Sequence, residues 1–188
     1  LTHANLSCNV QQIRCGLPLE DGQESELAVF PFFHSAGFTG VQNICVYAGW
    51  TDVLVPRPEP GIIVEILNKY KPTIMPGVPT IYTGLLADKT FQESDLSFIK
   101  TFLAGAAPLS TGTIKKLKDK TGAGIINVYG LTEISPMGTA TPWGGLEKPG
   151  SVGTPIPSTD LKIVDIDTGQ TEMPVGQPGE IAFKGPQV

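Results

Sequence analysis

Three segments place polar or small residues directly after apolar runs, which is where open α/β sheets bind ligands, at the carboxyl ends of their strands. They are Pro31 to Gly37 after a run ending at Phe30, Gly105 to Pro108 after a run ending at Ala104, and Asn127 to Glu133 around a run ending at Val128. Together they would bring small residues, aromatic rings, an amide, a hydroxyl and a carboxylate to one edge of a sheet. This set of groups indicates a nucleotide-binding cleft.

The third segment carries the most specific chemistry. Tyr129 offers a flat ring on which a base can stack, and Gly130 lets the backbone approach a ligand closely. Thr132 supplies a hydroxyl for a phosphate oxygen, and Glu133 supplies a hard carboxylate suited to Mg²⁺. Magnesium and a hydroxyl donor are enough to stabilise charge in a phosphoryl or nucleotidyl transfer. The alternative is an ordinary turn into a helix, with Thr132 as its cap and Glu133 in its first turn.

The elements that would position these segments alternate between short apolar runs and amphipathic stretches, the pattern of a parallel sheet with crossover helices. The predicted strands are Leu27 to Phe30, Val53 to Val55, Thr73 to Met75, Ile99 to Ala104 and Ile125 to Val128. The predicted helices are a buried one over Gly40 to Tyr47, one from Pro60 through Tyr70, one beginning at Pro79, and one from Ser110 or Thr111 to Gly122. The fold class is therefore α/β, with helices flanking a parallel sheet.

The character of the chain changes after Ser135, where closely spaced Gly and Pro residues exclude long helices. Two strand-like runs follow, Leu161 to Val164 and Glu180 to Phe183, and an Asp-Thr-Gly turn lies between them. We therefore predict an α/β unit over residues 1–140 and the start of a β unit over residues 141–188.

Composition bounds the class of protein and its partners. The chain has 188 residues with 13 Lys and Arg against 18 Asp and Glu, a formal net charge of −5, and 40% of its residues are hydrophobic. This balance excludes a disordered chain and disfavours nucleic acid, which binds to basic surfaces. The most apolar stretch, residues 32–50, contains polar side chains and is not a spanning helix. Three cysteines at spacings that match no zinc or redox pattern indicate free thiols, so we expect a cytoplasmic location.

The string Tyr-Gly-Leu-Thr-Glu at residues 129–133 resembles the signature of the adenylate-forming enzymes, and specifically of AMP-forming acyl-CoA synthetases of the long-chain fatty acid type. Further segments resemble motifs of the same family, in the same order along the chain. They are Leu1 to Leu6, Pro31 to His34, Val78 to Thr80, Gly105 to Leu109, Gly150 to Pro155 and Gly179 to Ile181. The resemblance covers essentially the whole chain.

The resemblance implies an enzyme that activates a carboxylic acid with ATP to an acyl-adenylate and then transfers the acyl group to coenzyme A, with Mg²⁺ as a cofactor. By this resemblance Tyr129 would stack on adenine, and Asn127 would bind the exocyclic amine of the base. Thr132 would contact the α-phosphate, and Glu133 would hold Mg²⁺. The remaining residues implied at the nucleotide are Gly105, Ala106, Ala107 and Gly130.

The resemblance places the acid beside His34, where its carboxylate would meet the α-phosphate, with Val78, Ile81 and Gly130 in the acyl pocket. The alternatives are a histidine that is satisfied at a strand end and apolar residues that belong to the core. Amino-acid-activating domains, which also resemble this chain, carry an Asp near the start of a segment like residues 32–37, and none stands here. An ammonium group would be left unpaired, which favours a plain, fatty carboxylic acid as the substrate.

In the family, a phosphate loop precedes a segment like residues 1–3. A segment like residues 179–185 is followed by an Asp that binds the ribose and by a mobile domain that carries a Lys. We therefore expect an internal fragment of the N-terminal domain that is inactive alone. The alternatives are a non-catalytic nucleotide-binding or scaffolding module, an amino-acid-activating domain, and luciferase-type oxygenation of an adenylate. The oligomeric state and any peripheral contact of the full-length enzyme with a membrane stay open.

Overall fold

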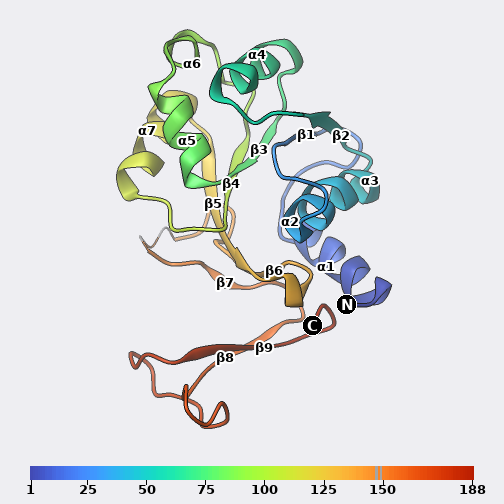
Figure 1. The fold of residues 1–188 in the computed structure, drawn as a ribbon, viewed down its shortest axis with the longest axis vertical. Coiled ribbons are helices and arrows are strands. Elements are labelled where there is room, and N and C mark those ends of the chain that lie inside the picture. The colour runs from blue at the N-terminus through green and yellow to red at the C-terminus, as the bar shows by residue number, and fades with distance from the viewer. Residues whose placement is uncertain (147, 149) are drawn as a thin grey trace.

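A mostly parallel sheet runs through the centre of the chain, which a computed structural model describes for residues 1–146, 148 and 150–188 (Figure 1). Its seven strands follow the order β2-β1-β3-β4-β5-β6-β7. The strands from β2 to β5 in this order pair in parallel, and β6 and β7 add to the β5 edge in antiparallel pairs. The strands are β1 (Ser25–Ala28), β2 (Thr51–Leu54), β3 (Ile74–Gly77), β4 (Thr101–Ala104), β5 (Gly124–Gly130), β6 (Met137–Ala140) and β7 (Thr154–Pro155).

Helices cover both faces of this sheet, as Figure 1 shows, so the predicted fold class is confirmed. One face carries α1 (His3–Cys15), α2 (Ser35–Gly37), the π-helical segment η1 (Phe38–Asn43) and α3 (Ile44–Ala48). The other face carries α4 (Pro60–Tyr70), α5 (Pro79–Ala87), α6 (Lys89–Glu93) and α7 (Thr111–Thr121). Alternate residues of β4 point to opposite layers: Phe102 belongs to the core under α4 to α7, and Leu103 to the core under α1 and α3.

The strongest helix predictions are confirmed together with the residues that end each helix. α4 begins with Pro60 in its first turn and buries Ile63 and Leu67. In α7, the Ser110 hydroxyl accepts a hydrogen bond from the Thr113 N–H at 3.1 Å. Gly122 then ends α7 in the left-handed conformation, with φ of 73°. No helix among the described residues combines the length and the apolar character needed to cross a bilayer.

Other elements differ from the sequence-based expectation for identifiable reasons. α1 and the short α6 were not predicted. The buried face of α1 includes the polar residues Asn9 and Gln12, so the sequence of α1 lacks the regular apolar spacing that indicates a helix. The first strand begins at Ser25 instead of Leu27, because the sheet buries the carboxyl group of Glu26 as if it were apolar. β5 continues two residues past the predicted end to Gly130, because β6 folds back and pairs with it.

A separate two-stranded sheet follows, made of β8 (Asp160–Val164) and β9 (Glu180–Lys184), and it confirms the two predicted C-terminal strands with small shifts at their ends. In Figure 1 this sheet lies below β6 and β7, at the far end from α4 and α6. The short β7, by contrast, still pairs with β6 in the large sheet. The division of the chain at residues 140 and 141 stays a prediction.

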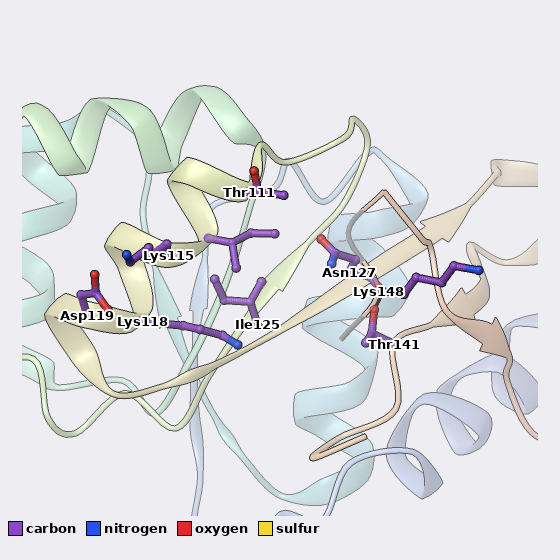
Figure 2. A pocket seen from close by; sticks show the side chains of 9 residues that line it. Thr111, Lys115, Lys118, Asp119, Ile125, Asn127, Thr141 and Lys148 are labelled. Carbon is purple, nitrogen blue, oxygen red and sulfur yellow. Dashed lines mark hydrogen bonds between the residues drawn. The ribbon is translucent and has the colours of Figure 1, made fainter. Parts of the chain in front are cut away.

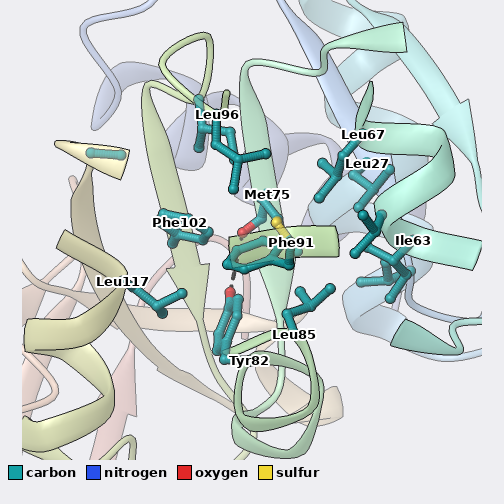
Figure 3. Packing of buried hydrophobic residues seen from close by; sticks show 14 of the residues in the cluster. Leu27, Ile63, Leu67, Met75, Tyr82, Leu85, Phe91, Leu96, Phe102 and Leu117 are labelled. Atoms are coloured by element: carbon teal, nitrogen blue, oxygen red, sulfur yellow. Dashed lines mark hydrogen bonds between the residues drawn. The ribbon is translucent and has the colours of Figure 1, made fainter. Parts of the chain in front are cut away.

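Tyr82 of α5 holds the carboxyl ends of β3 and β4 together from inside the core (Figure 3). Its hydroxyl lies 3.1 Å from the Met75 carbonyl oxygen and 2.9 Å from the Leu103 carbonyl oxygen, so it can donate to either strand. Its ring meets Phe102 edge-on, with 5.7 Å between the ring centroids. Gly77 makes room for the ring, since a Cβ there would lie 2.9 Å from Tyr82 Cζ. The fully buried phenol thus ties β3 to β4 within the core.

We predict that Tyr82→Phe lowers the free energy of unfolding by about 1–3 kcal/mol, because a buried carbonyl loses its hydroxyl donor while the ring stays. Tyr82→Ala is expected to cost about 3–5 kcal/mol, because it also leaves a cavity. Urea unfolding of the chain measures both changes. The control is Tyr70→Phe at an exposed position, and an equal loss in the control would contradict the assignment.

A second buried polar group, the carboxyl of Glu26 on β1, lies opposite Asp52 on β2 and within reach of α3. The Cys45 thiol donates to Glu26 Oε2 at 3.7 Å, while Oε1 of Glu26 has no partner among the described residues. Burial, with the nearby charge of Asp52 as a second cause, raises the pKa of Glu26 well above its usual range. Burial therefore favours the protonated, neutral form of the Glu26 carboxyl inside the sheet.

We predict that Glu26→Gln stabilises the fold at pH 7 by roughly 1 kcal/mol or more, because the neutral amide needs no proton to be buried. The raised pKa means that the stability contributed by the wild-type carboxyl is full below about pH 4.3 and is lost as the pH rises through the folded pKa. The variant should therefore show a flatter stability profile over this window in urea titrations at several pH values. Glu65→Gln, at an exposed position, is the control, and a parallel profile for Glu26→Gln and wild type would refute the assignment.

Candidate active site

A cavity of about 570 Å³ opens at the carboxyl ends of β3, β4 and β5, the edge where the sequence places all three polar segments. Its lining combines residues from each of them. The lining residues are Phe30, Pro31, His34, Ser35, Ala36, Gly40, Pro76, Val78, Leu103, Gly105, Ala106, Val128, Tyr129, Gly130, Leu131, Thr132, Glu133, Pro136 and Met137. The three polar segments therefore meet at one cleft, as the sequence predicts.

A tight loop between β5 and β6, residues 131–136, carries two polar side chains of the cavity, those of Thr132 and Glu133. The Leu131 N–H donates to the Pro136 carbonyl at 2.9 Å and closes the loop. A Cβ at Gly130 would lie 1.8 Å from the same carbonyl oxygen, so only glycine fits at this position. Within the loop, Thr132 and Glu133 lie exposed on the short 3-10 helix η2 (Thr132–Ile134). We call residues 131–136 the motif loop.

The alternative that Thr132 caps a following helix is wrong. Leu131 occupies the cap position of η2, and the helix is a single 3-10 turn, after which Ser135 adopts φ of 73°. The Thr132 hydroxyl instead lies 3.3 Å from the Ser35 hydroxyl, across the cavity on α2. This contact joins the first polar segment to the third.

His34 caps α2 and has a defined hydrogen-bonding state. Its Nδ1 accepts a hydrogen bond from the Ala36 N–H at 3.1 Å, so the neutral ring carries its proton on Nε2. The ring is exposed and lines the cavity. The turn before it is tight, because a Cβ at Gly37 would lie 2.2 Å from the Pro31 carbonyl oxygen. One ring nitrogen is thus satisfied by the backbone, and the other is a donor.

The second polar segment forms a wall of backbone. Gly105 is buried against Val128, whose Cγ2 would lie 2.7 Å from an added Cβ. Ala106 adopts the left-handed conformation with φ of 65° and lines the cavity with Gly105. Ala107 is exposed and, as far as the described residues define the lining, lies outside it. Tyr129 stands at the end of β5 and also lines the cavity.

Besides Ala107, two predicted site residues lie outside the described cavity lining. Asn127 lines a neighbouring pocket of about 290 Å³, where Figure 2 shows it on the other side from the α7 residues Lys115 and Asp119. Its backbone carbonyl accepts a hydrogen bond from the Thr141 N–H at 2.9 Å. Ile81 is half-buried on α5 and packs against the main core. The cavity lining holds neither residue among those described.

α1 supports the motif loop through its buried polar face. The Asn9 amide donates to the Met137 carbonyl at 2.8 Å, and Asn9 Oδ1 accepts from the Met137 N–H at 3.2 Å. This pair of bonds holds the first residue of β6 as a neighbouring strand would. The Ser135 hydroxyl donates to the carbonyl of Gln187 at 2.8 Å, near the C-terminus. Ser135, near the end of the motif loop, and Met137, just after it, are therefore each held by a residue distant in the sequence.

Sequence reasoning missed several residues of the site. Ser35 lies inside a segment that was singled out, yet nothing in the spacing indicates its contact with Thr132. Asn9 and Gln12 carry no local signal, because a polar residue on a buried helix face looks like an exposed one. No group of three or more His, Cys, Asp or Glu side chains that could hold a metal ion occurs within the described part of the chain.

Comparison with known proteins identifies the family of the chain. The AMP-binding enzyme family matches residues 1–188. A long-chain-fatty-acid–CoA ligase of Bacillus subtilis is 41% identical over 189 residues, which cover 100% of this chain and 34% of that protein. A long-chain-fatty-acid–CoA ligase of Escherichia coli is 35% identical over 192 residues, which also cover 34% of that protein. The chain thus spans about a third of the length of these curated relatives.

Solved structures show the same arrangement of elements. The ATP-bound crystal structure of MatB from Rhodopseudomonas palustris superimposes with a TM-score of 0.90 at 30% identity, covering 100% of this chain and 36% of that one. A long-chain-fatty-acid–CoA ligase from Archaeoglobus fulgidus does so with a TM-score of 0.87 at 30% identity, covering 39% of that chain. The ordered motifs, the fold and the match over every residue lead to one conclusion: the chain belongs to the family of AMP-binding enzymes.

Proposed function

We propose that this chain is the part of an AMP-forming acyl-CoA synthetase that holds the adenylate and the acid, and that the substrate is a fatty acid. The observation that carries the proposal is the cavity in which His34, Val78, Tyr129, Thr132 and Glu133 meet. The names of the relatives, long-chain-fatty-acid–CoA ligases, support the same class of substrate. The reaction joins the acid to coenzyme A in two steps.

In the first step, a carboxylate oxygen of the acid attacks the α-phosphorus of ATP, and pyrophosphate leaves. In the second step, the sulfur of coenzyme A attacks the acyl carbon, and AMP leaves. The contribution of this chain to the first step is to orient the two reactants within one cavity. The thiol substrate must then approach the same acyl carbon.

The nucleotide half of the cavity lies between β4 and the end of β5. Gly105 and Ala106 would form one wall of the base pocket and Tyr129 the other, with Ala107 at the rim. The MatB crystal structure, which superimposes on this chain and is bound to ATP, supports a nucleotide as the ligand. Asn127 would reach the exocyclic amine of the base from the side of β5 that faces the neighbouring pocket.

The phosphate half lies at the motif loop. The Thr132 hydroxyl would donate to an α-phosphate oxygen, and the tight reversal that Gly130 permits keeps this hydroxyl at the cavity. Glu133 fits Mg²⁺, because its exposed carboxylate lines the cavity and this ion typically takes one or two carboxylates together with phosphate oxygens. Bound Mg²⁺ would neutralise charge on the phosphates.

The carboxylic acid would bind in the part of the cavity beside His34. With Nδ1 engaged by the backbone, Nε2–H of His34 is the donor available to the carboxylate or to the α-phosphate oxygen it attacks. Phe30, Val78, Leu103 and Val128 give the deeper wall an apolar character that suits an alkyl chain, and Ile81 would back it from the core. Among the described lining residues Glu133 is the single carboxylate, so an amino acid's ammonium group would compete with Mg²⁺ for it. A plain acid is the better fit.

The location that we propose is the cytoplasm, since Cys8, Cys15 and Cys45 are free thiols of the kind that a reducing compartment maintains. The fatty acid itself partitions into membranes, so peripheral contact of the whole enzyme with a bilayer is part of the proposal. Nothing in the chain's acidic balance favours nucleic acid as a partner.

We predict that the 188-residue chain alone releases no pyrophosphate from ATP with any fatty acid of a chain-length panel. The reason is electrostatic: within the described lining of the cavity no Lys or Arg compensates the charge of the triphosphate. A coupled pyrophosphate assay measures the release, with the full-length Bacillus subtilis ligase as the positive control. Turnover above the no-enzyme background would show that these residues suffice for adenylation.

For the full-length protein we predict that Glu133→Gln lowers kcat/KM for adenylation by roughly 10²-fold or more, as expected when a group that stabilises transition-state charge is removed. The deficit should shrink as Mg²⁺ is raised, because the lost carboxylate weakens binding of the ion. Pyrophosphate exchange at several Mg²⁺ concentrations measures this dependence. Glu93→Gln, an exposed position on α6, is the matched control, and wild-type activity of Glu133→Gln at limiting Mg²⁺ would remove Glu133 from this role.

A further inference from the structure

The ring of Tyr129 is stacked against a second aromatic ring that comes from the other sheet. Phe183 of β9 lies parallel to it, with 6.3 Å between the ring centroids and an angle of 21° between the planes. Both side chains are half-buried. In Figure 1, β9 lies beneath the β5 to β6 turn, so the two-stranded sheet meets the site here. The sequence offers no signal for this pair, since the two rings belong to different predicted units.

The position of Phe183 is set by its surroundings. A Cβ at Gly138 of β6 would lie 2.6 Å from Phe183 Cε1 and 2.5 Å from Ile134 Cδ1. The absence of a side chain at Gly138 therefore lets the Phe183 ring lie directly on the backbone of β6, next to the buried Ile134 of the motif loop. Leu161 is its cross-strand partner on β8. Phe183 thus contacts both the start of the motif at Tyr129 and the space behind η2.

The segment that follows β9 is held to the same loop a second time. Gln187 is fully buried, and its carbonyl accepts the hydrogen bond of the Ser135 hydroxyl. Its side-chain amide donates to the Thr159 hydroxyl at 2.7 Å, and its Oε1 accepts from the Gln12 amide at 3.0 Å. With its carbonyl and both side-chain polar atoms engaged, Gln187 fixes the path of the chain after Phe183. Residues 183–187 therefore back the motif at both of its ends.

We propose that Phe183 is a positioning residue for Tyr129, and that it sets the affinity of the site for the adenine ring. The inference rests on the proposed function, in which Tyr129 stacks on the base. A phenol at a strand end samples several rotamers unless one of its faces is packed, and ordering it on ligand binding weakens affinity. Stacking against Phe183 orders the Tyr129 ring before the nucleotide binds, and Tyr129 still lines the cavity.

The test uses the full-length protein and separates nucleotide binding from acid binding. We expect Phe183→Leu to raise the KM for ATP and the Kd for AMP by roughly three- to tenfold, the range of an aromatic pair, while the KM for the fatty acid stays within twofold. Phe183→Trp, which keeps a flat ring, should restore values close to wild type. Phe98→Leu is the matched control, because Phe98 is also half-buried but packs against the main core. Should Phe183→Leu fail to fold, Phe183→Met keeps the volume without the ring.

A double-mutant cycle with Tyr129→Leu distinguishes failure of this inference from failure of the proposed function. If Phe183 acts through Tyr129, its replacement has no further effect on the KM for ATP in the Tyr129→Leu background. If Tyr129→Leu alone leaves the KM for ATP unchanged, the stacking role of Tyr129 fails. If Tyr129→Leu raises it while Phe183→Leu does not, or if Phe183→Leu raises the KM values of ATP and acid equally, only the positioning role of Phe183 is overturned.

Discussion

The close approach of Gly130 to the Pro136 carbonyl is the constraint on which the site depends. With 1.8 Å between an added Cβ and that oxygen, the chain can reverse there only without a side chain. The reversal lets β6 pair with β5 and leaves Thr132 and Glu133 in a loop that faces the cavity. A wider turn would carry both side chains away from His34 and Ser35. The hydroxyl of Thr132 and the carboxylate of Glu133 are thus positioned by a glycine.

The rest of the fold can be understood as support for this edge of the sheet. Tyr82 fixes the ends of β3 and β4 from the core side, so that Val78 and Gly105 emerge at the same level. On the opposite face, Asn9 of α1 bonds both backbone groups of Met137 and holds β6 after the motif loop. Helices on both faces of the sheet therefore hydrogen-bond the backbone of strands that border the cavity.

The sequence predicted those elements and site residues whose pattern lies within a short stretch of chain, and missed those that depend on contacts with distant residues. Periodic apolar residues with a capping serine and a terminal glycine made α7 predictable, and Pro60 marked the start of α4. The three polar segments were recognised because each follows an apolar run. α1 was not, because its inward face carries Asn9 and Gln12, and hydrophobic periodicity cannot register amides that are buried by pairing with distant backbone. Asn127 and Ile81 were expected at the cavity from the family resemblance, but Asn127 lines the neighbouring pocket and Ile81 packs against the main core.

The buried amides of α1 also have a consequence for how the chain folds. The bonds from Asn9 to Met137 join residues 128 positions apart, and those from Asn5 to Pro186 and Val188 join residues 181 and 183 apart. Contacts of such long sequence separation form late, because much chain entropy must be lost before they are made. The polar face of α1 is therefore satisfied only when Met137, Pro186 and Val188 have reached their final places. The loop that carries Thr132 and Glu133 would accordingly be among the last parts of the molecule to reach its final shape.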